Sequence, residues 1–480
     1  MRLWLVFLAA FPLAAQWPQF RGPNGSGVAP AHNLPTEFGP GKNMVWKADI
    51  PAGHSSPVIT GDRIFLTAAE GEKLVAQGDK VTDSGGGKLW TLCLDRRTGE
   101  ILWKKQAPKP RSEGRQKTNS AASPSPATDG RNVYVFFGDY GLIAYDLNGG
   151  ERWRQPLGPF INANGQGTSP IVEGNLVVLV CDQDKGSYAV AFDAETGRRR
   201  WKIDRPEVTR GYATPVVFHP ESGPAELIVN GAYRLDAYNL ETGERLWWVR
   251  GLSWHPKNTP VIAGNMIFAH SADSGGEAET PTETPTYQET LAEYDANKDG
   301  VLQLSELPVR LQSPGVVMDP DNDGIVTETE WNFYRARRSA RNALVAVRHG
   351  GIGDLTSTNV VWSMRKFLPN VTSPLYYEGV LYLVKEGGIL TSIDPGNGAI
   401  LKQGRLTGAL GQYWASPVAG DGKIYAISED GKVTVIKAGP QWEILALNDL
   451  NDTVFATPAI VEDRIYVRTQ SALYCFANRP

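Results

Sequence analysis

The sequence has few of the residues that disulfide-stabilised or catalytic domains depend on. Only three cysteines, Cys93, Cys181 and Cys475, occur in 480 residues, which excludes a disulfide scaffold. No HExxH, GxSxG or phosphate-binding glycine loop is present, and the six histidines are scattered. Basic and acidic residues nearly balance, at 48 and 52, and no long basic stripe occurs, so we expect no nucleic-acid partner.

Long hydrophobic runs are also scarce, and the only marked one is at the N-terminus. Residues 1–15 carry Arg2, then an apolar run ending in small residues, the pattern of a secretory signal peptide. The run is shorter than the ~20 residues of a membrane span, and no other stretch qualifies. We therefore expect an exported protein, periplasmic or extracellular, without a transmembrane segment. A buried first strand or an uncleaved anchor are the alternatives.

Glycine and proline, by contrast, are abundant, and proline marks a repeat. A small or hydroxylated residue, then Pro, then an apolar strand recurs eight times, and five of the seven spacings are 41–45 residues. That is the length of a four-stranded propeller blade, with Pro at a strand start where its missing N–H costs least. The prolines are Pro57, Pro126, Pro170, Pro215, Pro260, Pro374, Pro417 and Pro458.

The two ends of the chain predict how the repeats close. The last repeat stops at LYCFAN (473–478), where a third strand should end, and an unattached strand, VWKADIP (45–51), stands near the N-terminus. We expect this strand to complete the last blade, because closure removes an exposed sheet edge. The predicted fold is an all-β, eight-bladed β-propeller closed by an N-terminal strand.

A second pattern lies inside each repeat and carries a resemblance. The third strand ends in Asp or Asn, and a Thr-Gly turn leads to a fourth strand ending in Trp, most clearly at 191–201 and 237–247. This pattern resembles the tryptophan-docking repeat of pyrroloquinoline-quinone (PQQ)-type propellers. The family includes quinoprotein dehydrogenases and non-catalytic scaffolds, such as the propeller lipoprotein of outer-membrane barrel assembly. The sequence departs from it at Lys402, where Trp is expected.

The predicted fold indicates whether the cysteines form disulfides. Cys93 and Cys475 occupy equivalent third-strand positions in neighbouring blades, which places their Cα atoms farther apart than the ~7 Å limit for a disulfide. We expect all three cysteines to be buried free thiols.

The repeat is interrupted once at length, between Pro260 and Pro374. The excess corresponds to about 276–342, inserted after the second strand of blade five, with NALVAVRHG (342–350) resuming that blade. The predicted organisation is therefore a signal peptide (1–15), an N-terminal extension (16–44), a propeller (45–275 and 343–480) and an insertion (276–342).

The insertion contains two matches to the calcium-loop template D-x-[DN]-x-[DN]-G-x5-E. In the first loop (295–306) and the second loop (319–330), carboxylates, amides and a backbone carbonyl supply the oxygens that calcium prefers, and Gly300 and Gly324 take the sharp turn. Acidic surface turns are the alternative. The predicted ligands are Asp295, Asn297, Asp299, Val301, Gln303 and Glu306, then Asp319, Asp321, Asp323, Ile325, Thr327 and Glu330.

The second loop has four carboxylates against three, so we expect it to bind calcium more tightly. Only residues 307–318 separate the loops, which leaves no room for the two inner helices of a full EF-hand pair. We predict helices near 286–294 and 328–341, with Leu302 and Val326 joining the loops. The calcium role is then structural, because a pair short of helices has little to open. The arginines of the second helix are a solvated face or a docking patch.

A ligand surface is predicted at one mouth of the channel, from residues that precede the Ser/Thr-Pro steps. Mixed aromatic, amide and cationic side chains suit sugars, peptides or anionic groups, although they can equally serve to pack loops. Two polar segments, 70–88 and 109–120, read as mobile surface loops near this mouth. The mouth residues are His54, Asn119, Gln166, Arg210, Tyr212, Trp254, His255, Lys257, Asn370, Tyr413 and Trp414.

These observations favour an exported calcium-binding propeller that acts as a ligand-binding or protein-assembly module, with a protein or carbohydrate partner. A PQQ-dependent oxidoreductase acting on alcohols or sugars is the alternative. The adjacent cysteine pair on which many quinoproteins stack the quinone is absent, as is the haem-attachment motif CxxCH.

Overall fold

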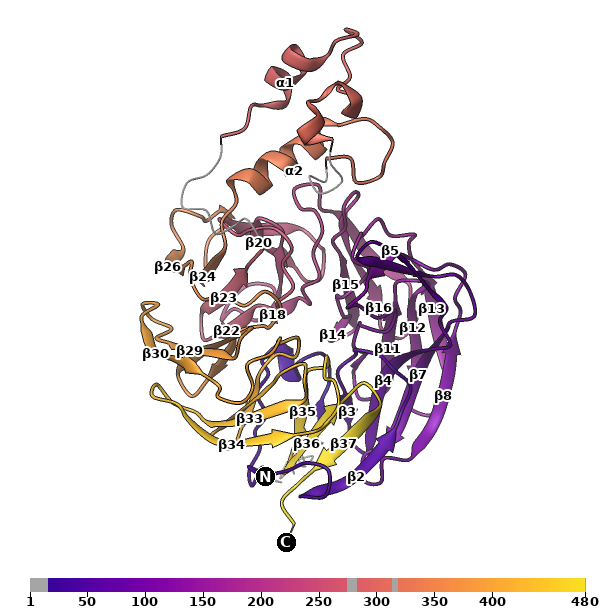
Figure 1. Cartoon of the computed structure of the whole chain (residues 1–480), viewed down its shortest axis with the longest axis vertical. Coiled ribbons are helices and arrows are strands. Elements are labelled where there is room, and N and C mark those ends of the chain that lie inside the picture. The colour runs from indigo at the N-terminus through magenta and orange to yellow at the C-terminus, as the bar shows by residue number, and fades with distance from the viewer. Residues whose placement is uncertain (1–15, 274–282, 313–317, 480) are drawn as a thin grey trace, which may run out of the picture.

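The computed structural model describes residues 16–273, 283–312 and 318–479, and this part of the chain is mostly β-strand (Figure 1). The predicted signal peptide (1–15) and residues 274–282 and 313–317 of the insertion lie outside the described residues. No helix in the described ranges is both long and apolar enough to cross a membrane.

Eight sheets of four or five strands follow one another along the described residues. In seven of them the strands lie in sequence order, whereas the last sheet takes its outermost strand from the N-terminal part of the chain. The first four sheets consist of β1 (Gln16–Trp17), β3 (Val58–Thr60), β4 (Arg63–Glu70), β7 (Lys88–Asp95) and β8 (Ile101–Ala107); β10 (Ala127–Thr128), β11 (Asn132–Phe137), β12 (Gly141–Asp146) and β13 (Glu151–Pro156); β14 (Ile171–Glu173), β15 (Leu176–Cys181), β16 (Tyr188–Asp193) and β17 (Arg199–Asp204); and β18 (Val216–Phe218), β19 (Glu226–Gly231), β20 (Arg234–Asn239), β21 (Arg245–Arg250) and β25 (Gly353–Asp354).

The last four sheets include the one that joins both ends of the chain. They consist of β22 (Val261–Ala263), β23 (Met266–Ser271), β24 (Ala343–Arg348) and β26 (Val360–Met364); β27 (Leu375–Tyr377), β28 (Val380–Lys385), β29 (Ile389–Ile393) and β30 (Ile400–Arg405); β31 (Val418–Gly420), β32 (Lys423–Ile427), β33 (Lys432–Lys437) and β34 (Glu443–Asp449); and β35 (Ala459–Val461), β36 (Arg464–Arg468), β37 (Ala472–Phe476) and β2 (Met44–Asp49).

The residue before each repeated proline links neighbouring sheets. The N–H of Ser56 donates to the hydroxyl of Ser125 at 2.8 Å, and the N–H of Ser125 donates to that of Ser169 at 2.9 Å. The same bond recurs from Ser169 to Thr214, and along the other half of the chain from Thr259 through Ser373 and Ser416 to Thr457. The Ser or Thr hydroxyl before the proline therefore accepts a hydrogen bond from a backbone N–H of the preceding sheet. This N–H lies at the start of the innermost strand, where the chain is buried and water cannot bind it.

The repeated tryptophans dock on the next sheet, as predicted. The indole N–H of Trp153 donates to the carbonyl of Ala194 at 2.9 Å, and that of Trp201 to Leu240 at 3.0 Å. Gly197 has φ 71°, a conformation that favours glycine, and any Cβ there would lie within 3 Å of the Trp153 ring. Both the backbone conformation and the close ring therefore require glycine at this turn. Lys402 fulfils the tryptophan's role: its Nζ donates to the carbonyl of Trp442 at 2.6 Å and lies over that ring.

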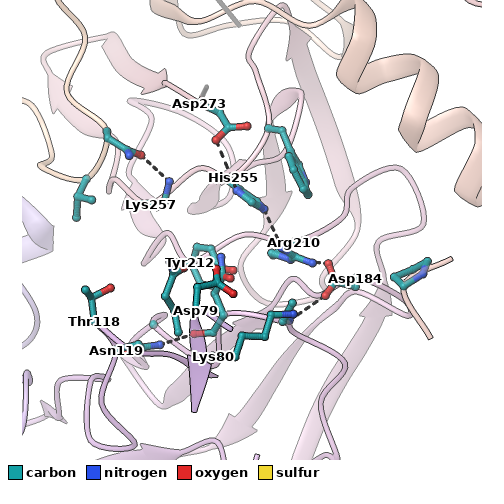
Figure 2. Close-up of a pocket in the computed structure, with 18 of the residues that line it drawn as sticks. Asp79, Lys80, Thr118, Asn119, Asp184, Arg210, Tyr212, His255, Lys257 and Asp273 are labelled. Carbon is teal, nitrogen blue, oxygen red and sulfur yellow. Dashed lines mark hydrogen bonds and ion pairs between the residues drawn. The ribbon is translucent and has the colours of Figure 1, made fainter. Parts of the chain in front are cut away.

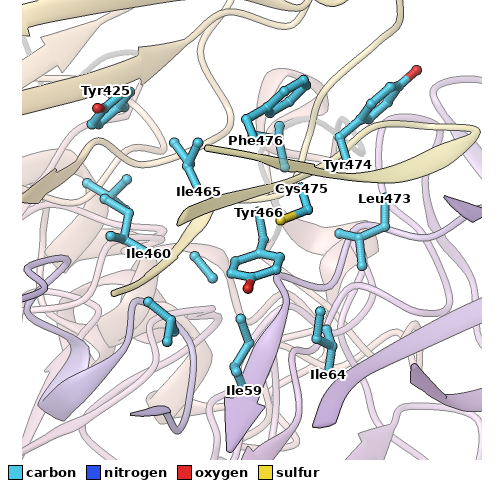
Figure 3. Packing of buried hydrophobic residues seen from close by; sticks show 14 of the residues in the cluster. Ile59, Ile64, Tyr425, Ile460, Ile465, Tyr466, Leu473, Tyr474, Cys475 and Phe476 are labelled. Atoms are coloured by element: carbon cyan, nitrogen blue, oxygen red, sulfur yellow. The ribbon is translucent and has the colours of Figure 1, made fainter. Parts of the chain in front are cut away.

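Strand β2 pairs with β37, so the N-terminal strand completes the last sheet as the sequence predicted. Figure 3 shows the apolar cluster beside this pairing, to which Tyr466 and Cys475 of the last sheet and Ile59 and Ile64 of the first sheet belong. All three cysteines are buried and free, which confirms the prediction for them.

The N-terminal extension is part of the core. Trp17 and Arg21 are fully buried, and the Arg21 guanidinium donates to the carbonyl of Pro374 at 2.6 Å. Burial lowers the pKa of Arg21 to about 9. Asn24 exchanges two hydrogen bonds with the backbone of Val217. The extension thereby connects innermost strands of sheets that are far apart in sequence.

The insertion leaves the propeller after β23 and returns as β24, which pairs with β23. It contains α1 (Tyr287–Tyr294), the 3-10 turns Leu304–Glu306 and Val309–Leu311, and α2 (Glu328–Ser339); a third such turn, Pro23–Gly25, lies in the N-terminal extension. Both helices begin with capping boxes, and their positions agree with the prediction. In Figure 1 the insertion projects beyond the sheets at the end opposite β2 and β37.

The two polar segments predicted as loops contain short paired strands, although in 109–120 only Arg115 and Gln116 are in a strand. Strands β5 (Leu74–Gln77), β6 (Lys80–Asp83) and β9 (Arg115–Gln116) make a separate three-stranded sheet. The composition of these segments misled the prediction, because the pairing of β6 with β9 joins residues far apart in sequence.

Candidate functional site

A cavity of about 930 Å³ lies between the innermost ends of the sheets and the insertion. We call it the mouth cavity (Figure 2). Phe20 of the N-terminal extension contributes to it, Asp79 and Lys80 line it from the β5–β6 turn, and the insertion contributes Met318 and Arg337 among others. Four separate parts of the sequence therefore build one site.

Most of the predicted mouth residues line this cavity. Nine of the eleven do so: His54, Asn119, Arg210, Tyr212, Trp254, His255, Lys257, Asn370 and Trp414.

The prediction is wrong for Tyr413 and Gln166, which are buried and do not line the cavity. The Tyr413 hydroxyl donates to the Ala409 carbonyl at 2.6 Å inside an apolar cluster. Neighbouring residues of an extended segment point to opposite sides, so Trp414 faces the cavity and Tyr413 faces the core.

A chain of polar contacts crosses one wall of the mouth cavity. Arg210 Nε donates to Asp184 at 2.5 Å, and Arg210 Nη1 lies 3.3 Å from Nε2 of His255, whose Nδ1 is 3.8 Å from Asp273. Burial lowers the pKa of His255 to about 3, so the imidazole is neutral at pH 7. Trp254 stacks on this imidazole with centroids 3.5 Å apart. The wall is thus rigid, and its charges are largely paired.

Two further groups that line the cavity, Lys257 and His54, have no carboxylate partner among the described residues. Lys257 Nζ donates to the amide oxygen of Asn370 at 2.6 Å, and no carboxylate of the described residues lies within 4.0 Å of it. Burial lowers the pKa of Lys257 to about 8. His54 stacks on Phe455 at 4.1 Å, and burial, assisted by Arg468 and Arg115, lowers the pKa of His54 to about 3. Lys257 therefore offers a cation, and His54 and Phe455 offer aromatic faces, to a ligand.

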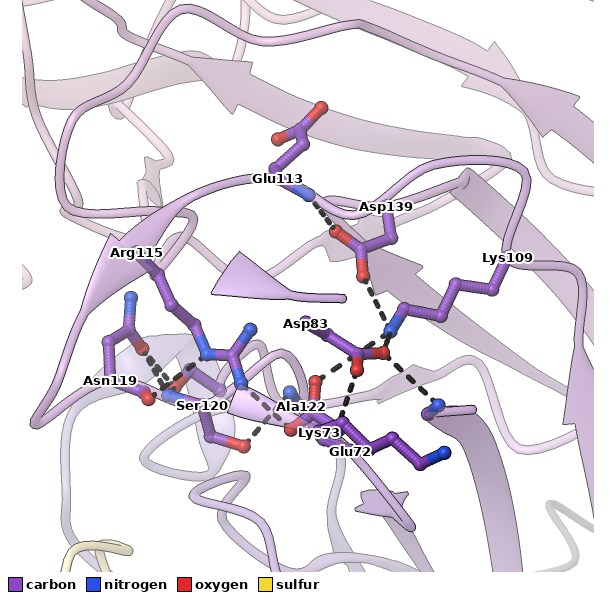
Figure 4. Close-up of polar contacts among 12 residues, drawn as sticks. Glu72, Lys73, Asp83, Lys109, Glu113, Arg115, Asn119, Ser120, Ala122 and Asp139 are labelled. Carbon is purple, nitrogen blue, oxygen red and sulfur yellow. Dashed lines mark hydrogen bonds and ion pairs between the residues drawn. The ribbon is translucent and has the colours of Figure 1, made fainter. Parts of the chain in front are cut away.

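A buried ion network supports a wall of the mouth cavity (Figure 4). This network was not predicted from the sequence. Lys109 Nζ contacts Asp83 and lies 3.6 Å from Asp139 and 3.8 Å from Glu72. Arg115, the first residue of β9, pairs with Glu72 at 2.8 Å. No short motif marks these residues, because they meet only after β6 and β9 pair.

The network shifts the pKa values of its carboxyl groups in opposite directions. Burial raises the pKa of Asp139 and of Glu113, since a charged carboxylate is poorly solvated there. Burial also opposes ionisation of Asp83, but Lys109 and backbone N–H donors outweigh it and the pKa falls to about 2. Asp83 is the fixed anion of the network, and its contacts hold the β5–β6 turn beside the cavity.

The two predicted calcium loops lie against each other. The N–H of Val326 donates to the carbonyl of Leu302 at 2.8 Å, and Gln303 and Ile325 form a bridge between the loops. Leu302 and Val326 are fully buried in the same apolar cluster, with Trp331. The sequence had assigned this joining role to these two residues.

The second loop has the geometry of an oxygen-rich metal site. Ligand oxygens of Asp319, Asp321 and Asp323 lie within 4.8 Å of one another. Asp321 Oδ1 and Glu330 Oε1 are buried without a hydrogen-bond partner, and Glu330 is only 5% exposed. Burial raises the pKa of Glu330. Unpartnered buried carboxylate oxygens are costly unless a cation meets them, so the residues present fit calcium.

In the first loop the side chains satisfy one another. Asp295 accepts from the N–H groups of Asp299 and Gly300, and Asp299 accepts from the amides of Asn297 and Gln303. Glu306 accepts from backbone N–H groups at both ends of the loop. The loop is more exposed than the second one.

Comparisons with known proteins agree with this architecture. The family model described as "Outer membrane protein assembly factor BamB" matches residues 39–157, 90–248 and 315–480, which is more than half of the chain. This protein belongs to that family.

Two relatives from the same family are 26% identical to the chain. The BamB of Burkholderia pseudomallei strain K96243 aligns over 312 residues, 63% of this chain and 68% of the relative. That of Bordetella pertussis strain Tohama I aligns over 252 residues, 49% of this chain and 55%, about half, of the relative. Among solved structures, a europium-containing methanol dehydrogenase matches with a TM-score of 0.59 at 11% identity, over 97% of this chain and 98% of that chain. The BamB-family chain thus has the β-propeller fold of PQQ-like repeats.

The mouth cavity of this BamB-family propeller is lined by Asp79, Asp184 and Asp273, together with Asp319 of the second loop. In the described residues, the only group of three or more acidic, histidine or cysteine side chains able to hold a metal is the one in the second loop. Asp184 and Asp273 instead pair with Arg210 and His255. All three cysteines are in the apolar cores.

Proposed function

We propose that this chain is an exported β-propeller that binds protein partners as an assembly module, with the mouth cavity as its binding site. Membership in the BamB family carries the proposal, since its relatives are named as assembly factors for outer membrane proteins. The cavity supports it, because aromatic faces and one cation with only an amide partner suit a peptide segment better than catalysis. A periplasmic location follows from the predicted signal peptide and from the same relatives.

The proposal includes a ring of eight blades. Eight successive sheets, the inter-sheet hydroxyl bonds and the pairing of β2 with β37 support it, and β1 and β3 of the first sheet both contact β35 of the last sheet. In such a ring, the extension crosses the channel and the insertion overhangs the mouth.

Calcium is proposed to bind both loops and to act structurally. The converging carboxylates and unpartnered oxygens of the second loop support a tight site there, and the self-satisfied first loop supports a weaker one. The insertion's apolar cluster is small, so calcium would supply much of its stability.

Genetic complementation tests the assembly role. A strain that lacks this protein is expected to contain less outer membrane protein, restored by the wild type and not by a variant with Trp414→Ala and Lys257→Ala. Asn175→Ala, in a turn away from the cavity, is the matched control. Normal outer membrane protein levels in the deletion strain, or full rescue by the cavity variant, would contradict the proposal.

A quinoprotein oxidoreductase is the second candidate, favoured by the fold shared with methanol dehydrogenase. Reconstitution of the purified chain with PQQ and calcium, followed by dye-linked oxidation of alcohols and aldose sugars, tests it. Turnover above the apoprotein would replace the assembly proposal with this one. We expect none, because the cavity has no convergent carboxylates for a quinone-bound ion.

A further inference from the structure

The second loop forms an ion pair with Lys185 of the propeller. Lys185 lies in the connection between β15 and β16, and its Nζ contacts Oδ2 of Asp321 and lies 3.8 Å from Oδ2 of Asp323. The ammonium lowers the pKa of Asp321, and these carboxylates raise the pKa of Lys185. Asp321 and Asp323 are also the predicted calcium ligands at positions 3 and 5 of the loop.

Helix α2 adds apolar and stacking contacts beside this ion pair. The Arg337 guanidinium lies 3.8 Å from the ring centroid of Trp254, and Phe333 stacks on Tyr233 with centroids 6.5 Å apart. The Tyr233 hydroxyl donates to the Phe333 carbonyl at 3.3 Å. Trp254 and Arg337 both line the mouth cavity, so this interface forms part of its rim.

We propose that calcium and the Lys185 ammonium compete for the carboxylates of the second loop, so that calcium weakens the contact between the insertion and the propeller at the rim of the mouth cavity. The inference rests on the calcium binding proposed above. It deepens that proposal by naming a propeller residue that sets the affinity of an insertion site.

Charge counting gives the direction of the coupling. Four carboxylates, Asp319, Asp321, Asp323 and Glu330, attract Lys185 when no divalent cation is bound. Calcium at about 2.3–2.6 Å from its ligands removes half of that negative charge and places two positive charges beside the ammonium. Linkage makes the effect reciprocal: Lys185 weakens calcium binding by the same factor by which calcium weakens the Lys185 contact.

The alternative to competition is that calcium and Lys185 bind Asp321 at the same time, through different oxygens. Lys185 contacts Oδ2 of Asp321, whereas Oδ1 is the unpartnered atom. If calcium takes Oδ1 and the lysine keeps Oδ2, both cations are held together and the competition is absent. Measurement of calcium affinity with and without the lysine distinguishes the two arrangements.

The experiment uses the full chain with Glu306→Gln, which silences the first loop. Calorimetric titration with calcium at low salt is expected to show about 5- to 10-fold tighter binding for Lys185→Gln, within the usual range of coupling between sites. The gain shrinks at high salt because the exposed ammonium is screened. Lys185→Arg keeps the charge and is expected to match the parent. Lys202→Gln, on β17 of the same sheet with its Nζ over Tyr188, removes a charge elsewhere and is the control.

A second readout follows the lysine itself. Acetylation of Lys185, followed by mass spectrometry, is expected to accelerate several-fold when calcium is added, whereas acetylation of Lys202 stays constant. Unchanged affinity in Lys185→Gln together with unchanged acetylation would overturn the competition and leave the calcium site standing. Failure of the Glu306→Gln chain to bind calcium at all would overturn the calcium proposal and, with it, this inference.

Discussion

The propeller and its insertion are stabilised in contrasting ways. In the propeller, the same few contacts recur in sheet after sheet: a hydroxyl before proline accepts from the preceding sheet, and a tryptophan docks on the following one. The insertion has one small apolar cluster, two capped helices and two polar loops. Repetition makes the propeller tolerant of an altered repeat, as Lys402 shows, whereas the contacts of the insertion are not repeated elsewhere in the described residues.

The two predicted calcium loops repeat this contrast on a smaller scale. Both loops match one template. In the first loop, amide groups of the loop donate hydrogen bonds to its carboxylate oxygens, whereas in the second loop Asp321 Oδ1 and Glu330 Oε1 have no hydrogen-bond partner. Their surroundings differ, and the surroundings determine the expected affinity.

Acid should destabilise the propeller more than any single substitution, because all its buried histidines are held neutral. Burial lowers the pKa of His54 and His255 to about 3 and that of His270 to about 4. Between pH 6.5 and these values the unfolded chain binds protons that the folded chain does not, so stability falls as pH falls. We expect a loss of about 1 kcal/mol per histidine for each pH unit below 6.5, measured by denaturant unfolding. An equal slope in His54→Gln would contradict this account.

Loss of a docking tryptophan should have the next largest effect. Trp201→Ala removes a buried ring and its bond to the Leu240 carbonyl, and we expect a destabilisation of about 3–5 kcal/mol. Lys402→Ala, which removes only a charged hydrogen bond at the equivalent position, should cost about 1–2 kcal/mol. Equal losses in thermal unfolding would show that docking energy does not depend on the buried ring.

Calcium removal should act on the insertion and leave the propeller folded. At 100 times its Kd, a bound ion stabilises the state that binds it by about 2.7 kcal/mol, so chelation is expected to expose the insertion to protease while the β signal in circular dichroism persists. Glu330→Gln should reproduce this effect. Glu306→Gln should do so only weakly, and the reverse ranking would contradict the assignment of the tighter site.

The smallest expected effect concerns the contact between the two regions. Phe333→Ala removes the stack on Tyr233, which is worth about 0.5–1.5 kcal/mol. Hydrogen exchange in α2 should rise in this variant, and exchange in the neighbouring strands β19 and β20 should not. Tyr334→Ala, one residue away on the same helix, is the matched control, because its ring packs on Trp331 inside the insertion and its loss should leave the contact with Tyr233 unchanged.

The repeat predicted much of the fold, because each of its residues has a local physical role. Proline starts a strand, glycine takes a positive φ, and a tryptophan needs a neighbouring surface, so eight copies and the strand at 45–51 indicated the pairing of β2 with β37. The calcium loops were equally local, since one template fixes the turn and the oxygens. Prediction failed at Tyr413, and it failed at segments 70–88 and 109–120, where pairing of distant residues gives strands that composition does not reveal.

The sequence by itself determined the repeat, the free cysteines, the place of the insertion in the chain and the donor set of its loops. Only the tertiary structure decided that Phe20, Lys80, Lys257 and Arg337 share one cavity, and that Lys185 meets the second loop. The physical reason is range. Turn geometry and strand patterning act over a few residues, whereas a cavity and an ion pair between regions depend on how whole sheets are placed, which no short stretch of sequence encodes.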